Sequence, residues 1–170
     1  RAAATAADPD SSAFGRVYLE YADILLAGAR ADDERALRTA RDALELVKAS
    51  ELEDYFQDDC VATLHARTAG VDRIDAHTAV VYPMVFDDRL ELLASVGPRL
   101  QRMTIPITRS DLTARIKTFR RLLEKRTTRQ YLPHAQALYT LLFAPLAPTL
   151  DAAAIDTVVV VPDDVLRLFP

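Results

Sequence analysis

The segment ELEDYFQDDCVATLHA, residues 51 to 66, contains the residue types that cysteine-dependent catalysis requires. It holds Cys60, the only cysteine of the chain, together with His65 and five carboxylates. A cysteine nucleophile needs a basic side chain within hydrogen-bond reach, and that base usually needs a third group to orient it. If the segment is helical, Cys60 and His65 lie about 140° apart around the helix axis, on different faces.

The charge around Cys60 argues further against a reactive thiolate. Negative charge disfavours the thiolate, which is the nucleophilic form of cysteine. We therefore predict that Cys60 is a small buried residue at a helix end. Its acidic neighbours Asp54, Asp58 and Asp59 are expected to be solvated or paired with bases. The sequence assigns no catalytic residue.

Metal and cofactor sites find no support in the residue spacing. DYFQDDC lacks the glycine and the bidentate glutamate of an EF-hand loop, and the histidines at 65, 77 and 134 have no regular ligand spacing. The four glycines are scattered, so the chain has neither a glycine-rich phosphate loop nor a GxSxG motif. We predict no metal and no cofactor. A carboxylate pair for acid–base catalysis stays open, although acidic runs are more often solvated surfaces.

The composition indicates a globular protein of one domain with a short helical addition. The chain has 170 residues and a net charge of −4. The opening RAAATAADPDSS is small and polar, unlike a signal peptide. The apolar stretch ALYTLLFAPLAPTL is interrupted by Pro145 and Pro148 and is too short to span a bilayer. We expect a soluble, cytoplasmic protein with no membrane partner.

The first part of the chain predicts two antiparallel helices. In the first helix, the apolar residues predicted to face inward are Val17, Tyr21, Ile24 and Leu25. Asp32 or Asp33 can cap the second helix, whose predicted inward residues are Leu37, Ala40, Leu44 and Val47. The small side chains of Ala36, Ala40 and Ala43 would allow the two helices to approach each other closely. Such a hairpin is the unit of a tetratricopeptide array, and because one unit cannot close its own core, we expect the end of an array.

The middle of the chain predicts an antiparallel meander. AHTAVVYPMVF gives a β-rich run from Thr78 to Phe86, and RLELLAS and LQRMTIPI follow after short turns at residues 87–88 and 97–98. Pro83 and Pro106 each lack a backbone donor. We therefore expect both prolines at strand ends, sheet edges or bulges.

The last part of the chain predicts two helices and a buried strand. Thr108 and Asp111 form a capping box that opens a helix with the inward residues Leu112, Ile116, Phe119 and Leu123. The next helix is expected to bury Leu132, Ala135, Leu138, Leu142 and Leu146. TVVVVPDD has the apolar continuity of a strand that is buried on both faces.

Two expectations follow from this valine run. Residues 157–161 should form an interior strand, so that Val159→Asp costs several kcal/mol by burying an unpaired charge. VLRLFP should begin another short strand. A domain ending there would leave a sheet edge uncovered, and we therefore expect the sequence to be part of a longer one.

The helix that follows Thr108 is strongly basic. Its bases are Arg109, Arg115, Lys117, Arg120, Arg121, Lys125, Arg126 and Arg129. Such a surface could bind nucleic acid, but no aromatic residue accompanies the bases on it, because Phe119 falls on the apolar face. Residues 32–59 carry ten acids against four bases. We therefore favour docking of the basic helix on protein, within the chain or between domains, over binding to nucleic acid.

Several segments, in order, resemble a known family. ARDALELVKASELEDYFQDDCVA resembles the opening segment of CHAT domains, the caspase-like peptidase domains that follow tetratricopeptide repeats in bacteria. TAVVYPMVFDDRLELLASV is similar to their first strands. FRRLLEKRTTRQYLPHAQALYTLLFAPLAPTL is similar to their helical pair, and IDTVVVVPDDVLRLFP to the strand that precedes the catalytic half. The resemblance covers the chain from Phe14 onward.

The resemblance implies an α/β fold, in which a tetratricopeptide-like helical hairpin precedes the first half of a caspase-like sheet domain. It divides the chain into a flexible lead-in (1–13), the hairpin (14–60) and the non-catalytic N-terminal half of a CHAT domain (61–170). The family's histidine–cysteine dyad falls beyond the segment that matches Leu166 to Pro170. Neither Cys60 nor His65 corresponds to it.

The expected function is therefore a non-catalytic scaffold of a CHAT-type cysteine peptidase. Its expected partners are the catalytic half, upstream helical repeats, and a protein substrate or activator. The alternative is a free-standing protein–protein interaction module without peptidase activity. A nucleic-acid binder is a third, less favoured interpretation, because the basic helix lacks aromatic residues on its exposed face.

Overall fold

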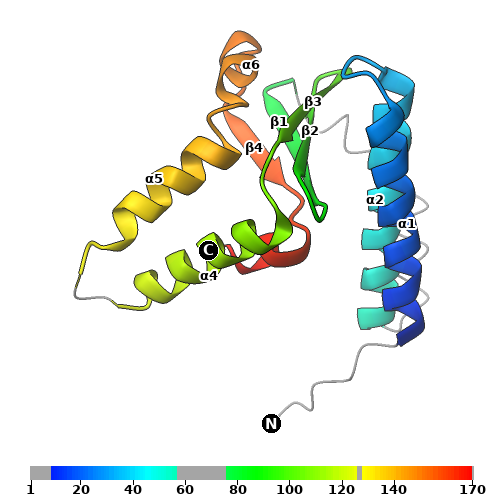
Figure 1. The fold of residues 1–170 in the computed structure, drawn as a ribbon. Helices are drawn as coiled ribbons and strands as arrows, with labels where there is room; N and C mark the ends of the chain where they lie inside the picture. The colour runs from blue at the N-terminus through cyan, green and yellow to red at the C-terminus, as the bar shows by residue number, and fades with distance from the viewer. Residues whose placement is uncertain (1–8, 57–75, 126–127, 170) are drawn as a thin grey trace. The chain divides into compact units, whose positions relative to one another are not determined.

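The computed structural model describes residues 9–56, 76–125 and 128–169, without the side chains of residues 9–14 and 52–56. The chain divides into two compact units, residues 1–71 and 72–170. The first unit is helical, and the second is built on a sheet (Figure 1). The predicted α/β class is confirmed. None of the described helices is long and apolar enough to cross a membrane.

The first unit contains the predicted pair of helices, α1 (Pro9–Gly28) and α2 (Glu34–Phe56). Asp33 caps α2, because its Oδ1 accepts a hydrogen bond of 3.0 Å from the backbone N–H of Ala36. The predicted inward face of α2 is confirmed, and its buried residues are Ala36, Leu37, Ala40, Ala43, Leu44 and Val47.

The predicted inward face of α1 is wrong for three of its four residues, and the fourth, Leu25, is half-buried. Val17, Tyr21 and Ile24 are 63%, 49% and 75% exposed, whereas Ala22 and Leu26 are buried. Helix α1 is apolar on two sides, and the side with small residues packs on α2. A Cβ on Gly15 would lie only 3.4 Å from Cγ1 of Val47, so the helices approach each other closely at this position.

The second unit contains a mixed sheet of four strands in the order β3-β2-β1-β4. Strands β1 (Thr78–Val85), β2 (Leu90–Val96) and β3 (Arg99–Ile105) form the predicted antiparallel meander. Strand β4 (Thr157–Val160) pairs with β1 in parallel. Gly97 has a φ of +57° in the turn between β2 and β3, a conformation that glycine adopts without a steric penalty.

Pro106 and Pro83 occupy different kinds of position. Pro106 follows β3 directly, as expected for a strand end. Pro83 lies inside β1, a central strand. The backbone groups of Val81 face β4, because its carbonyl accepts from Val161 N–H at 2.9 Å. Backbone groups two residues apart face the same neighbour, so the backbone nitrogen of Pro83 also faces toward β4. The parallel pairing of β1 with β4 ends at Val81. The missing donor thus falls where the ladder stops.

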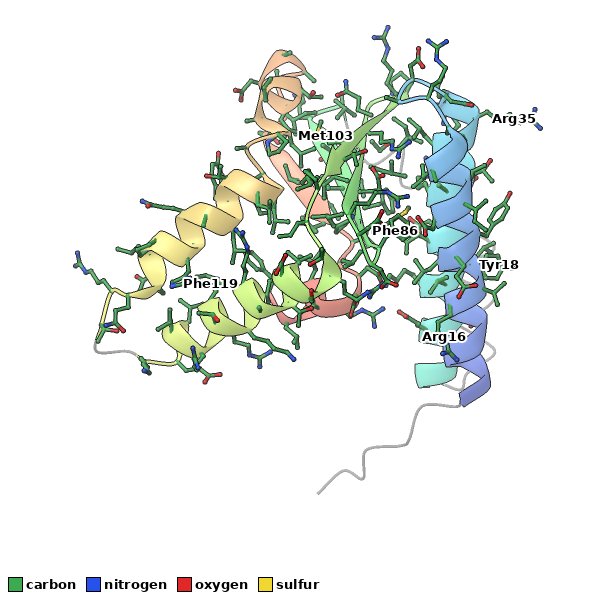
Figure 2. The ribbon with its side chains drawn as sticks, in the orientation of Figure 1. Arg16, Tyr18, Arg35, Phe86, Met103 and Phe119 are labelled. Carbon is green, nitrogen blue, oxygen red and sulfur yellow. The ribbon has the colours of Figure 1, made fainter. Side chains whose placement is uncertain are left out.

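One face of the sheet, here called the core face, packs against helices of the same unit. These are α4 (Arg109–Leu123), α5 (Tyr131–Leu142) and the 3-10 helix η2 (Asp164–Leu168). The N-cap half of the predicted capping box is confirmed, because Thr108 Oγ1 accepts from the N–H of Asp111 at 3.1 Å. Leu112, Ile116 and Phe119 are buried as predicted. Phe119, labelled in Figure 2, packs against Phe169, with ring centroids 5.7 Å apart.

Two predictions for the last third of the chain need correction. Helix α5 ends at Leu142, and Leu146 precedes a separate short helix, α6 (Ala147–Ala152). Leu132 is 42% exposed, although Leu138, Leu142 and Leu146 are buried as expected. The first four residues of VLRLFP, 165–168, lie in η2 and not in a strand. Asp164 has a φ of +46°, which turns the chain so that both Val165 and Leu166 enter the core.

Strand β4 is not the interior strand that its sequence predicts. It lies at the edge of the described sheet (Figure 1). Val158, Val159 and Val160 are 37%, 37% and 40% exposed. Continuous apolarity fits burial between two neighbouring strands, but β4 pairs with β1 alone in the described part of the chain.

Candidate functional site

The segment that suggested cysteine chemistry lies outside the described residues. Cys60, His65, Asp58 and Asp59 all belong to it, and the side chain of Asp54 is also not described. Of the other histidines, His77 has Nδ1 at 3.1 Å from the carbonyl of Ala154, and His134 lies half-buried on α5. Within the described ranges no three acidic, histidine or cysteine side chains are grouped so that they could hold a metal ion.

Glu91 is the one charged side chain among the described residues with no exposed surface. It lies on β2, on the sheet face opposite the core face. Arg102 of β3 donates to both of its oxygens, at 2.7 and 3.0 Å. Arg89 donates at 2.8 Å and the Thr104 hydroxyl at 2.7 Å. The guanidinium of Arg89 also lies 4.8 Å from the ring centroid of Phe86, which is labelled in Figure 2.

These hydrogen bonds decide the protonation of Glu91. Burial raises the pKa of the carboxyl, but the hydrogen bonds from Arg102, Arg89 and Thr104 outweigh it, so the pKa lies below its ordinary value. A carboxylate with a lowered pKa and all its hydrogen bonds made is a poor proton donor or acceptor near neutral pH. Glu91 therefore joins β2 to β3 and is not a candidate for acid–base catalysis.

Arg109 connects the end of β1 to η2. Its Nε donates to Asp87 Oδ1 at 3.0 Å, and its Nη2 donates to the carbonyl of Val85 at 2.6 Å. Its Nη1 donates to Asp164, the residue that begins η2. This arginine therefore helps hold η2, and with it Leu166 and Phe169, against the core face.

The free edge of β4 carries backbone groups that no other described residue satisfies. The N–H of Thr157 donates to His77 at 3.2 Å, and that of Val161 donates to Val81 at 2.9 Å. Because backbone groups alternate along a strand, Val159 also faces β1, whereas Val158 and Val160 direct their N–H and C=O groups outward. The next outward residue is Pro162, which has no N–H to donate.

An apolar cavity of about 50 Å³ lies beside this edge. It is lined by residues of β1, β2, β4, α5 and η2 and by residues next to them: Val81, Pro83, Leu92, Leu142, Phe143, Val160, Pro162, Leu166 and Phe169. Sites for small molecules usually measure about 300–1,000 Å³. The cavity is thus too small for a cofactor or a substrate and has room for part of one aliphatic side chain. We call β4 with this cavity the edge site.

The exposed side of α4 is basic, as predicted. Arg120 lies 3.9 Å from Glu124. Among the residues that the structure describes, no ion pair forms with the exposed Arg115, Lys117, Arg121 and Lys125. Three acids of α2 pair with bases of the same helix: Glu34 with Arg38, Asp42 with Arg41, and Glu51 with Lys48. Docking of the basic side on protein stays a prediction.

No family model matches the chain, and no curated protein is significantly similar.

Sequence reasoning missed Glu91 and the edge site for different reasons. A signal for Glu91 was present, because a short turn at residues 97–98 pairs Glu91 with Thr104 and places Arg102 diagonally across from it. The edge site depends on which neighbour β4 lacks, and the sequence of β4 alone carries no signal for that.

Proposed function

We propose that this chain is the non-catalytic half of a CHAT-type, caspase-like cysteine peptidase. In this role it supports a catalytic half and transmits contacts from upstream helical repeats. The proposal rests on the resemblance of the ordered sequence segments. The succession of a helix pair, a meander, helices and a parallel edge strand is compatible with it.

The observation that carries the proposal is an uncovered apolar surface in each unit, where a neighbour is expected. In the first unit, Val17, Tyr21 and Ile24 form an exposed apolar row on α1, and their spacing of four and three residues places them on one side of the helix. A neighbouring repeat would cover such a row. In the second unit, β4 exposes three valines and its outward backbone groups, and a continuing sheet would cover these.

A second candidate is a free-standing interaction module without peptidase activity. The same uncovered surfaces favour it, as does the basic side of α4. The two candidates differ in what a longer chain does. A peptidase needs a histidine and a cysteine after Pro170 that act together, whereas an interaction module does not.

Peptide cleavage tests the proposal. The chain as it stands, residues 1–170, is incubated with a fluorogenic peptide library under reducing conditions, beside a longer chain that continues past Pro170. We expect no thiol-dependent cleavage by the first and thiol-dependent cleavage by the second. Replacing the downstream cysteine with alanine serves as the control and should abolish cleavage. A longer chain that binds partners through these surfaces but cleaves nothing favours the interaction module.

A further inference from the structure

We propose that the edge site binds an extended polypeptide segment, which adds a strand beside β4 and places one aliphatic side chain in the cavity. That this segment belongs to a catalytic half rests on the proposed function. The chemistry of the segment does not, since it follows from the backbone and the cavity of β4.

The backbone of β4 requires an extended partner. The outward N–H and C=O groups of Val158 and Val160 lie two residues apart, about 6.5–7 Å along the strand. Another β-strand presents complementary donors and acceptors at this interval. A helix cannot do so, because its backbone groups are already bonded within the helix. Pro162 offers no donor at the next outward position, so the pairing is short.

The cavity requires an aliphatic group at one position of that strand. Val160 belongs to both parts of the site, because its backbone points outward and its side chain lines the cavity. Val160 also pairs with Val81, so the two side chains lie on the core face. A strand beside β4 would therefore present alternate side chains to the same face, and the residue next to Val160 would reach the cavity.

The size and lining of the cavity restrict this residue further. All nine lining residues are apolar, so a charged or amide side chain would lose its hydrogen bonds to water without replacement. A volume of about 50 Å³ is well below the roughly 150 Å³ of an engineered cavity that holds benzene. Aliphatic side chains such as valine, leucine or isoleucine fit this requirement, and aromatic ones do not.

Proline substitutions distinguish the backbone donors of β4 that point outward from those that point toward β1. Val160→Pro removes an outward donor and leaves the bonds from Thr157, Val159 and Val161 to β1 in place. Val159→Pro is the matched control, because it removes a donor that faces β1. We expect Val159→Pro to lower the melting temperature clearly and Val160→Pro to change it little. Val158→Pro removes the other outward donor and repeats the test if Val160→Pro does not fold.

The binding probe is a fluorescein-labelled peptide of ten residues, in which threonine and valine alternate around one central leucine. Anisotropy should show saturable binding to residues 1–170 and at least tenfold weaker binding to the Val160→Pro chain. Replacing the central leucine with glycine should also weaken binding at least tenfold. In the free chain, the amides of Val158 and Val160 should exchange with deuterium faster than those of Val159 and Val161. The peptide should slow the exchange of the outward pair.

Three results would overturn the inference. The first is that the unsubstituted chain does not bind the peptide at concentrations up to millimolar. The second is that the Val160→Pro chain binds the peptide with equal affinity. The third is that replacing the central leucine with glycine leaves the affinity unchanged. Dimerisation that Val160→Pro abolishes would assign the edge to a second copy of the chain instead. If the peptide binds as expected and a longer chain cleaves nothing, the proposed peptidase function fails and the edge site stands. The edge site alone is contradicted if the amides of Val158 and Val160 stay unprotected in a longer, unsubstituted chain and its Val160→Pro variant keeps full activity.

Discussion

Glu91 links β2 to β3 through its side chain, in addition to the backbone pairing of the two strands. The carboxylate accepts hydrogen bonds from two arginines and a threonine on or beside β2 and β3. A buried ion pair contributes little net stability over an apolar pair of similar shape, but removing one member leaves the other buried and uncompensated. The folded second unit therefore depends on the charge of Glu91.

We predict that Glu91→Gln lowers the free energy of unfolding at pH 7 by about 3–5 kcal/mol, because Arg102 and Arg89 lose their counter-charge. Urea denaturation measures the change. Asp88→Asn is the control: Asp88 also pairs with Arg89, but its side chain is 76% exposed, so the change should stay within about 0.5 kcal/mol. Equal losses for the two variants would contradict the structural role of Glu91.

The same residue predicts a dependence of stability on pH. The pKa of Glu91 is lowered in the folded chain, so the unfolded chain takes up the proton at higher pH. Its contribution is complete above the unfolded pKa of about 4.3 and declines as the pH falls toward the folded pKa. The difference in unfolding free energy between the parent and Glu91→Gln should therefore narrow below about pH 4.3. A difference that widens in acid would contradict this direction.

The helix cap at Asp33 offers a second test on single residues. Asp33→Ala should lower the free energy of unfolding of the first unit by about 0.5–2 kcal/mol, because the N–H of Ala36 loses its acceptor. Asp32→Ala removes a neighbouring acid of the same type, which pairs with exposed Arg30, and should have less effect. Circular dichroism during thermal unfolding compares the two. A larger loss of stability for Asp32→Ala would indicate that Asp32, and not Asp33, caps α2.

At the scale of elements, the sequence predicts the buried face of a helix or the pairing of strands correctly where a single local feature determines it. Helix α2 has a single apolar stripe of small and large residues. The predicted burial of Leu37, Ala40, Leu44 and Val47 is therefore confirmed. The meander is also correct, because short turns restrict strands to antiparallel pairing. Helix α1 is apolar on two sides, and hydrophobic spacing alone does not say which side packs on α2.

The predictions for β4 and for the segment that forms η2 are wrong for other reasons. A run of valines indicates a strand, but its burial depends on neighbours outside the run. Asp164 has a left-handed conformation, and its carboxylate accepts from Arg109, which lies 55 residues earlier in the sequence; the sequence of this stretch alone carries no signal for either. Among the candidate site residues, Glu91 could have been found by pairing β2 with β3, whereas the cavity requires the packing of β1, β2, β4, α5 and η2.

The exposure of β4 changes the expected effect of Val159→Asp. Val159 is 37% exposed, so the new carboxylate keeps contact with water, and we expect a loss of about 1 kcal/mol from strand preference. Val81→Asp in β1, where the residue is only 3% exposed, should cost several kcal/mol. Urea denaturation of residues 1–170 compares them. Similar losses would indicate that β4 is covered in solution.

At the scale of the whole molecule, the two units share one property. Each leaves apolar side chains exposed on a side of an element that does not pack into its own core. For Val17, Tyr21 and Ile24 this is the far side of α1, and for the valines of β4 it is the sheet edge. Surfaces of this kind usually mark interaction sites when they are contiguous.

Substitution on α1 tests whether this surface belongs to the fold or to a neighbour. Ile24 is 75% exposed, so Ile24→Glu should change the free energy of unfolding of residues 1–170 by no more than about 0.5 kcal/mol. Leu26→Glu, on the buried side of the same helix, should be strongly destabilising. In a longer chain that includes upstream repeats, Ile24→Glu should become destabilising as well. Unchanged stability there would exclude a neighbouring repeat on this side of α1.

The measurement that bears most directly on the proposed function is peptide cleavage by a longer chain carrying Cys60→Ala. Removing a true nucleophile reduces turnover by several orders of magnitude. If residues 1–170 form a non-catalytic half, the Cys60→Ala chain should cleave a fluorogenic peptide at nearly the unsubstituted rate, while replacement of the downstream cysteine abolishes cleavage. Thiol-dependent cleavage by residues 1–170 alone, lost in Cys60→Ala, would contradict the account and make Cys60 the nucleophile.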